Sequence, residues 1–173
     1  MSPPALRQPK YLVFGLILAL FIIAADQAVK WWVLDLFRSG AARAALSYEI
    51  TGFFNLVLVW NRGVSFGMFN HDTLVMPIML IALAAVLVGF VTRWLMRAET
   101  WLEAAAFGLI IGGALGNVID RIRRGAVVDF LDFHIHFQGI DHHWPAFNVA
   151  DSAIVVGAGL ILYLWGLGGK TKI

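Results

Sequence analysis

Residues Gly112 to Asp151 read GGALGNVIDRIRRGAVVDFLDFHIHFQGIDHHWPAFNVAD, and this stretch decides the fold. It begins inside one long apolar segment and ends where another begins. It carries five of the chain's eleven acidic residues and four of its five histidines, although 60% of the chain is hydrophobic. Ionisable side chains are costly near hydrocarbon, so they are usually paired or face a polar cavity, and they usually serve function. We therefore interpret this stretch as a functional site at a membrane.

The composition places the chain outside the range of soluble domains. Its mean hydropathy is +0.79, and 14% of its residues are charged, against about a quarter in soluble domains. A length of 173 residues leaves room for a single domain over residues 1–173. The absence of cysteine excludes disulfides, thiolate metal sites and a cysteine nucleophile. The net charge is +2 and the basic residues form no run, so we expect no nucleic-acid partner.

Four segments are long and apolar enough to span a bilayer, which takes about 20 residues in a helix. We expect spans at about residues 11–32, 74–93, 101–121 and 151–169. The third is rich in alanine and glycine, and small residues allow transmembrane helices to pack closely. A cleaved signal peptide is disfavoured because the apolar helical pattern continues past Ala25. Four spans place both termini on one side, and the Lys and Arg residues near the span ends favour the cytoplasm for it, although arginines also occur on the opposite face.

The segment between the first two spans is too mixed in character to be a span. Ser39 to Tyr48 predicts a short helix on the membrane surface. Gly52 to Trp60 is rich in β-forming residues, and the turn signal Asn61-Arg62-Gly63 leads into Val64 to Phe69, which predicts a hairpin. Open sheet edges are not tolerated in hydrocarbon, so this part should lie at headgroup level or against protein. The predicted fold is a membrane all-α core with a small β element.

Paired carboxylates are the main chemical signal. The third span runs outward and the fourth runs back, so Asp129 after the third and Asp151 at the start of the fourth lie at the same membrane face. Two close aspartates share a proton, so that one can accept a proton from water while the other hydrogen-bonds a carbonyl. This chemistry suits peptide hydrolysis. Spacing alone does not choose between Asp129 and Asp132, and it allows that these acids are ion-pair partners or caps, as Asp151 could be.

Each of the other polar residues can be interpreted either as structural or as functional. Asp26 and Lys30 lie four apart on one helix face, either as an interfacial ion pair or as part of the site. Asp120 stands beside Arg121 and could be paired with it. Four amides lie in apolar surroundings and each needs a hydrogen-bond partner. They are Asn55, Asn61, Asn117 and Asn148.

The histidines invite a metal interpretation. His134 and His136 would point to one face of a strand, with Asp141, His142 and His143 nearby. Their spacing fits no strong zinc motif, and the chain contains no H-E-x-x-H. We therefore expect no metal and no cofactor.

With these residues in place, the chain resembles lipoprotein signal peptidase (signal peptidase II), a family of bacterial inner-membrane aspartic peptidases. The resemblance covers nearly the whole chain, and the order of its motifs on four spans makes it specific. The motifs are Asp26-Gln27-x-x-Lys30; Asn55-Leu56 followed by Asn61-x-Gly63-x-Ser65-Phe66; Gly112-Gly113-Ala114-x-Gly116-Asn117-x-x-Asp120-Arg121; Val127-Val128-Asp129-Phe130; and Phe147-Asn148-x-Ala150-Asp151-Ser152. The segment His134 to His143 is a few residues longer than the family's usual connection, which leaves its conformation open.

The resemblance implies the roles that spacing leaves open. It makes Asp129 and Asp151 the catalytic pair. It implies an extracytoplasmic β-cradle and a short interfacial helix beside the four transmembrane helices, with the active site near the periplasmic face. The implied reaction removes the signal peptide from a diacylglyceryl-modified prolipoprotein, N-terminal to the lipidated cysteine. We expect a monomer in contact with membrane lipid, with both termini in the cytoplasm. The residues expected to bind substrate or support the pair are Asp26, Lys30, Asn55, Asn61, Gly63, Asn117, Arg121 and Asn148.

Two other classes of function are alternatives to the peptidase. A small proton- or cation-coupled membrane transporter should carry acids at several depths of the membrane. Here the acids gather at one face, and the middles of the second and fourth spans contain no ionisable residue. A metal-dependent membrane hydrolase would depend on the histidines and would lose activity with a chelator.

Overall fold

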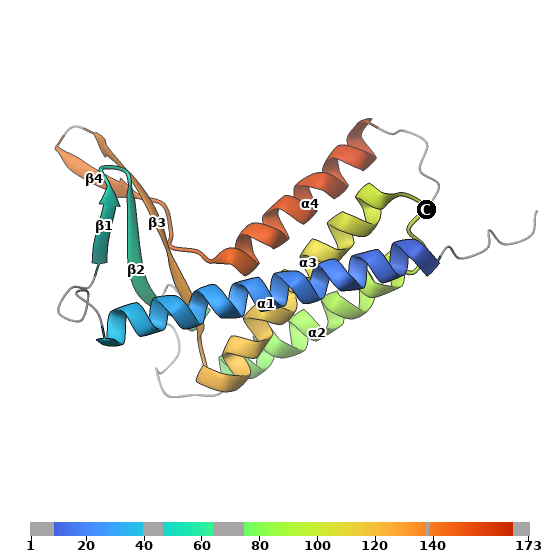
Figure 1. Cartoon of the computed structure of the whole chain (residues 1–173), viewed down its shortest axis with the longest axis horizontal. Helices are drawn as coiled ribbons and strands as arrows, with labels where there is room; N and C mark the ends of the chain where they lie inside the picture. The colour runs from blue at the N-terminus through green and yellow to red at the C-terminus, as the bar shows by residue number, and fades with distance from the viewer. Residues whose placement is uncertain (1–8, 40–46, 64–74, 138, 168–173) are drawn as a thin grey trace, which may run out of the picture.

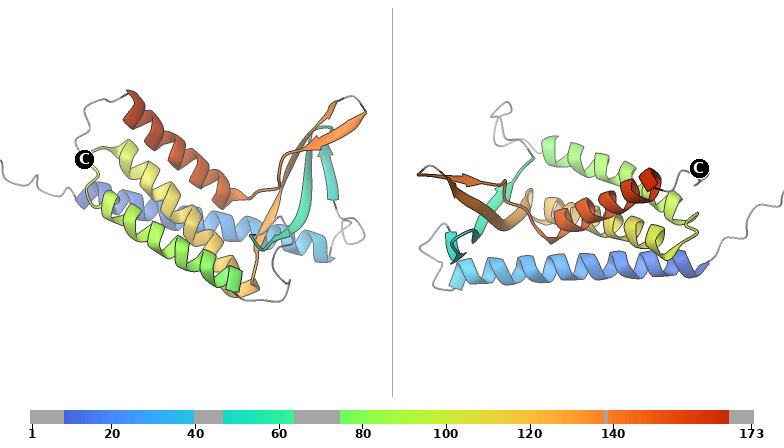
Figure 2. Two further views of the ribbon diagram at one scale, coloured as in Figure 1. Left: turned by 180° about the vertical axis from the view of Figure 1, so that it is seen from behind. Right: turned by 90° about the horizontal axis from the view of Figure 1, so that it is seen from above.

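Four long helices run alongside one another, and a β-sheet extends from one end of them (Figures 1 and 2). The computed structural model describes residues 9–39, 47–63, 75–137 and 139–167. The helices are α1 (Pro9–Ser39), α2 (Val75–Leu95), α3 (Trp101–Arg124) and α4 (Val149–Leu167). The strands are β1 (Ser47–Thr51), β2 (Phe54–Asn61), β3 (Val127–Phe137) and β4 (Ile140–His143). The start of α1 and the end of α4 lie at the end of the bundle opposite the sheet (Figure 1).

All four predicted spans are confirmed as helices long and apolar enough to cross a membrane. Their observed bounds lie close to the predicted ones, except at the end of the first. There α1 continues beyond residue 32 to Ser39. The reason is packing, because Val33 is fully buried in an apolar cluster beneath the sheet, together with Leu56 and Phe130. The helix therefore extends past the predicted membrane boundary to support the β element.

Helix α3 is the centre of the bundle and packs against each of the other three. In its most apolar window 56% of residues are buried, against at most 22% in the other spans. Its small residues permit this contact. A Cβ added to Gly108 would lie 2.5 Å from the carbonyl oxygen of Gly15 on α1, closer than real Cβ atoms approach any atom. The close packing expected from the small residues of the third span is thus confirmed.

The sheet is antiparallel with the order β1-β2-β3-β4. Its longest strand, β3, follows α3 almost directly, because Gly125 ends the helix in a left-handed conformation with φ of +73°. The strand predicted at Gly52 to Trp60 is confirmed as β2. Both of its edges are occupied, by β1 and β3, so it forms its hairpin with the preceding strand.

Two predicted pieces fall wholly or largely outside the described residues. One is the second arm of the predicted hairpin, Val64 to Phe69, which includes the motif residues Ser65 and Phe66. The other is the short surface helix expected at Ser39 to Tyr48. Only its ends are described, with Ser39 as the last residue of α1 and Tyr48 in β1.

Buried polar residues lie between two apolar clusters. The first cluster occupies the helices and includes Ala19 and Ile111, and the second lies beneath the sheet and includes Val33. Along α1, the buried side chains of Asp26 and Lys30 come between Ala19 and Val33. The chain therefore places its buried charges where the helices meet the sheet.

Replacing Gly108 with alanine should destabilise the protein, because the new methyl group would collide with backbone of α1. Overpacking of this kind typically costs about 1–3 kcal/mol. The matched control is Gly159→Ala on α4, where an added Cβ meets nothing within 4 Å. Thermal unfolding of both variants in detergent should show a lower Tm for Gly108→Ala alone. Equal Tm values would contradict the close contact of α1 and α3.

Candidate active site

The start of α4 is fixed by a reciprocal cap. The side-chain oxygen of Asn148 accepts a hydrogen bond from the backbone N–H of Asp151 at 2.9 Å. In return, Oδ2 of Asp151 accepts one from the backbone N–H of Asn148 at 3.2 Å. This is the arrangement of a capping box, which satisfies helix N–H groups that have no partner inside the helix. Asp26 of α1 supplies a further cap, because its Oδ1 accepts the N–H of Ala150 at 3.0 Å. The N-cap of α4 is therefore Asn148, and not Asp151 as the sequence allowed. Asp151 is the reciprocal partner in the first turn of the helix, and the two bonds hold its carboxylate in place.

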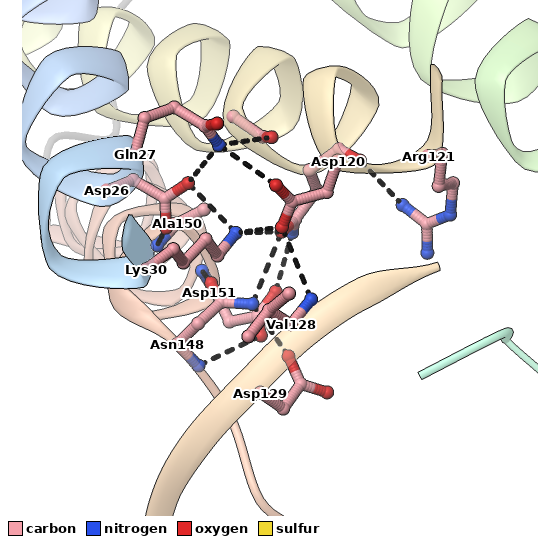
Figure 3. A network of polar contacts seen from close by, with 12 residues as sticks. Asp26, Gln27, Lys30, Asp120, Arg121, Val128, Asp129, Asn148, Ala150 and Asp151 are labelled. Carbon is pink, nitrogen blue, oxygen red and sulfur yellow. Dashed lines mark hydrogen bonds and ion pairs between the residues drawn. The ribbon is translucent and has the colours of Figure 1, made fainter. Parts of the chain in front are cut away.

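The carboxylates of Asp129 and Asp151 lie on either side of Asn148 (Figure 3), and a second asparagine, Asn117, also binds the pair. Nδ2 of Asn148 donates to Oδ1 of Asp129 at 2.7 Å, while its oxygen caps Asp151. Nδ2 of Asn117 on α3 donates to Oδ1 of Asp151 at 2.7 Å. Asn148 also donates to the oxygen of Asn117 at 3.3 Å. Residues from α3, β3 and α4 are thereby joined in one hydrogen-bonded group.

Asn61, at the end of β2, binds the remaining oxygen of the pair. Its Nδ2 donates to Oδ2 of Asp129 at 2.9 Å. Its own oxygen accepts the backbone N–H of Gly63 at 2.8 Å, which orients the amide. Gly63 has a φ of +87°, a conformation that side-chain-bearing residues rarely adopt. The turn that contains this glycine therefore aims Asn61 at Asp129.

The environment of Asp129 shifts its titration. Burial raises the pKa of Asp129 to about 6, and the negative charge of Asp151 adds to the increase. Hydrogen bonds from Asn61 and Asn148 act in the opposite direction, since they favour the ionised form. Asp129 can thus gain and lose a proton near neutral pH. This property is typical of groups that transfer protons in a reaction.

A buried ion network lies beside the pair. Lys30 is fully buried, and its Nζ lies 2.9 Å from Oδ2 of Asp26 and 2.7 Å from Oδ2 of Asp120. Asp120 is also bound by Arg124 at 2.5 Å and by the backbone N–H of Val128 at 3.2 Å. The network therefore pairs two acidic groups with two basic groups, and its net charge is zero. These groups are Asp26, Asp120, Lys30 and Arg124. The interfacial ion pair considered for Asp26 and Lys30 is in fact a buried network that joins α1, α3 and β3.

The network includes two residues that sequence reasoning did not select. Asp120 pairs with Lys30 and Arg124 rather than with its neighbour Arg121, because adjacent residues on a helix point in different directions. Gln27 donates to the carboxylates of Asp26 and Asp120, at 3.2 and 3.1 Å. Both residues stand inside the motifs quoted above, which was the available signal.

Lys30 also touches the site itself, because its Nζ donates to the oxygen of Asn117 at 3.3 Å. Arg121, one turn after Asn117, contacts the backbone oxygen of Asn117 at 3.5 Å. Its Nε is buried and has no hydrogen-bond partner among the residues that the structure describes. The side chain lies near enough to Asp151 and Asp129 to interact with their charges. A buried donor without a partner beside two carboxylates is suited to bind an incoming acceptor.

Asn55 is the one predicted site residue that lies elsewhere. Its Nδ2 donates to Oδ2 of Asp132 at 3.0 Å and lies 3.3 Å from Nδ1 of His134. Asp132 also binds His143 at 2.9 Å. Because side chains alternate along a strand, Asp132 and Asp129 project from opposite faces of β3. Of the two aspartates between which spacing did not choose, Asp129 is the one that shares hydrogen-bond partners with Asp151.

Comparison with known proteins gives one consistent result. The model of the signal peptidase (SPase) II family matches residues 18–166. The chain is 44% identical over 149 residues to the lipoprotein signal peptidase of Nitrobacter hamburgensis, covering 86% of this chain and 89% of that protein. It is 43% identical over 158 residues to that of an Azoarcus species, covering 91% and 85%. A solved bacterial membrane enzyme is 25% identical and superposes with a TM-score of 0.69, covering 87% of this chain and 91% of that one.

Replacing Lys30 with methionine should strongly destabilise the protein. The substitution leaves Asp26 and Asp120 buried with one cation fewer, and breaking a buried ion pair in this way typically costs about 3–5 kcal/mol. Arg123→Met, at an exposed position of α3, is the matched control and should stay within about 0.5 kcal/mol of wild type. Thermal unfolding in detergent measures both. A Lys30→Met protein as stable as the control would show that the network does not hold the helices together.

Proposed function

The chain belongs to the signal peptidase II family, and we propose that it is an aspartic endopeptidase in which Asp129 and Asp151 form the catalytic pair. Its relatives are named lipoprotein signal peptidases. The substrate that follows is a diacylglyceryl-modified prolipoprotein, cleaved N-terminal to the lipidated cysteine. The observation that carries the proposal is the junction of two carboxylates from separate elements through the amide of Asn148.

The hydrogen bonds that the pair accepts leave lone pairs on its carboxylate oxygens for the reaction. Among the residues that the structure describes, each of its four carboxylate oxygens accepts one hydrogen bond, from Asn61, Asn117 or the side chain or backbone of Asn148. A carboxylate oxygen has a second lone pair, so each can still accept a bond from water or carry a proton. The amides hold both carboxylates in position, while the second lone pairs of the carboxylate oxygens bind water and substrate.

The proposed reaction needs one proton shared between the two aspartates. The ionised carboxylate removes a proton from a bound water, whose oxygen attacks the scissile carbonyl carbon. The protonated carboxyl hydrogen-bonds to the carbonyl oxygen and stabilises the negative charge that develops on it. The tetrahedral intermediate then collapses, the C–N bond breaks and the leaving nitrogen takes up a proton from the pair. Asp129, with a pKa of about 6, is the group that we assign as the proton carrier.

Arg121 is suited to hold the substrate. Its buried Nε has no hydrogen-bond partner within the described part of the chain and lies beside the pair, so a peptide carbonyl can complete its hydrogen bonding. Arg121 binds this carbonyl in the proposed complex, while Asn117 and Asn148 keep the aspartates in place.

The four apolar helices make the chain a multi-pass membrane protein, in keeping with a bacterial inner-membrane family. In the proposed orientation both termini are cytoplasmic, and the pair lies near the periplasmic face, at the end of the bundle that carries the sheet (Figure 1). A lipidated cysteine and the signal helix would then reach the site by lateral diffusion in the bilayer.

The transporter alternative is not favoured by the relatives, which are peptidases by name. The positions of the buried charges agree with this. Among the described residues, the buried ionisable groups lie on α1, α3 and β3, where the helices meet the sheet, and the part of α2 that is described has none buried.

Asp129→Asn and Asp151→Asn should each abolish cleavage, since neither amide can exchange protons with water or substrate. A positioned proton-transferring group contributes about 100- to 10,000-fold to the rate, so kcat/KM should fall by at least about 100-fold. The assay uses purified protein in detergent with a diacylglyceryl-modified prolipoprotein and follows release of the signal peptide, with and without chelator.

The matched control is Asp141→Asn, which removes an exposed carboxylate from the same sheet. It should retain the wild-type rate, and a chelator should change nothing. Cleavage by either folded dyad variant at close to the wild-type rate would overturn the catalytic assignment. Loss of activity with chelator alone would favour the metal-dependent hydrolase instead.

The pH dependence should report the raised pKa of Asp129. If this residue carries the reactive proton, its protonated fraction falls as pH rises through about 6, so kcat/KM should decline above that pH, by up to about tenfold per unit. Asn61→Ala removes a hydrogen bond that favours the ionised form. The pKa should therefore rise further, and the declining limb should move to higher pH. A limb that stays in place or moves to lower pH would contradict the role of Asp129 as proton carrier.

A further inference from the structure

The β3–β4 hairpin has two chemically different faces. Cross-strand partners point to the same side of a sheet, and successive residues alternate between sides. The pairs Ile135–His142 and Phe137–Ile140 therefore lie on one face, which is mostly apolar. The pairs His134–His143 and His136–Asp141 lie on the other. Asp132 also projects from this second face, because it is two residues before His134.

The side chains on the polar face are already in contact. Nδ1 of His143 lies 2.9 Å from both oxygens of Asp132. The rings of His134 and His143 are stacked, with centroids 5.1 Å apart. One possible ligand atom from each of these three residues lies within 4.8 Å of the others. Asp132 is buried, whereas His143 is half exposed, so the group is open to solvent on one side.

We propose that Asp132, His134 and His143 bind a zinc ion at a site separate from the catalytic pair. Two imidazoles and one carboxylate are a common zinc donor set, and water commonly completes it as the fourth ligand. Ligand atoms around tetrahedral zinc lie roughly 3.3 Å apart, given bonds of about 2.0 Å. The oxygens of Asp132 and Nδ1 of His143 are 2.9 Å apart, which is close to this separation, and rotation of the partly buried ring of His134 brings its nitrogen to the third position. Sequence spacing does not reveal the site, because the cross-strand pair that completes it depends on the register of β3 and β4.

The polar residues around the site support the same geometry. Asn55 of β2 donates to Oδ2 of Asp132, which fixes the carboxylate while leaving it a lone pair for a metal. The bound ion joins β4 to β3 directly, and joins β2 to both through Asn55. Zinc at this position therefore stabilises the sheet, and it plays no part in the hydrolysis carried out by residues on the other face of β3.

The test measures zinc binding by the purified full-length chain, prepared in detergent without a polyhistidine tag. Equilibrium dialysis should find one zinc ion per chain. Cobalt in place of zinc should give the intense visible absorption of a tetrahedral site. Zinc should also raise the Tm. His143→Gln and His134→Ala should each weaken zinc binding by at least tenfold and remove the cobalt spectrum and the zinc-dependent rise in Tm.

The hairpin itself offers the matched control. His142→Ala removes the neighbouring histidine, which faces the other side of the sheet. His136→Ala removes a histidine whose Nδ1 lies 2.7 Å from Oδ1 of Asp141, in hydrogen-bond contact. Both variants should bind zinc as wild type does. The proposal is overturned if the wild-type chain binds no zinc. It is also overturned if His142→Ala weakens binding as much as His143→Gln, since that result would mean unspecific attraction to a histidine-rich strand.

Discussion

The buried charge of Lys30 is the constraint on which the rest of the structure depends. An ammonium group without exposure to water must be surrounded by acceptors, and here these come from α1 and α3 as Asp26, Asp120 and Asn117. Each of these acceptors has a second contact. Asp26 caps α4, Asp120 binds the backbone at the start of β3, and Asn117 binds Asp151. The two helices, the strand and the cap are thereby positioned relative to one cation.

The catalytic proposal rests on an unequal pair. Asp151 belongs to a helix N-terminus, where its Oδ2 accepts the backbone N–H of Asn148. Asp129 stands on a buried strand, and burial favours its neutral form. Two chemically identical side chains thus stand in different surroundings, one at a helix N-terminus and one on a buried strand. Asn148, the cap of one and hydrogen-bond donor of the other, holds them together.

Hydropathy and motif order predicted the four spans, the strand at Gly52 to Trp60 and most of the polar site. The predictions fell short where the answer depends on packing between distant segments. The continuation of α1 to Ser39 needs the sheet against which Val33 is buried. The partners of Asp120 lie on another helix and one turn away, not beside it. Asn55 faces Asp132 because of the register of β2 and β3, which includes an irregularity between Leu56 and Val59. None of these contacts can be inferred from the composition of the neighbouring sequence.

The spacing of the ion network has a consequence for how the chain enters a membrane during synthesis. Asp26 and Lys30 are four residues apart on α1, and Asp120 and Arg124 are four residues apart on α3. Each charge can therefore find a counter-ion on its own helix before the other helix exists. A solitary charge in hydrocarbon costs several kcal/mol, whereas a neutral pair costs less. The Asp26–Lys30 pair can thus remain neutral within the first helix until the third helix is made. The pairs from the two helices then join into one cluster.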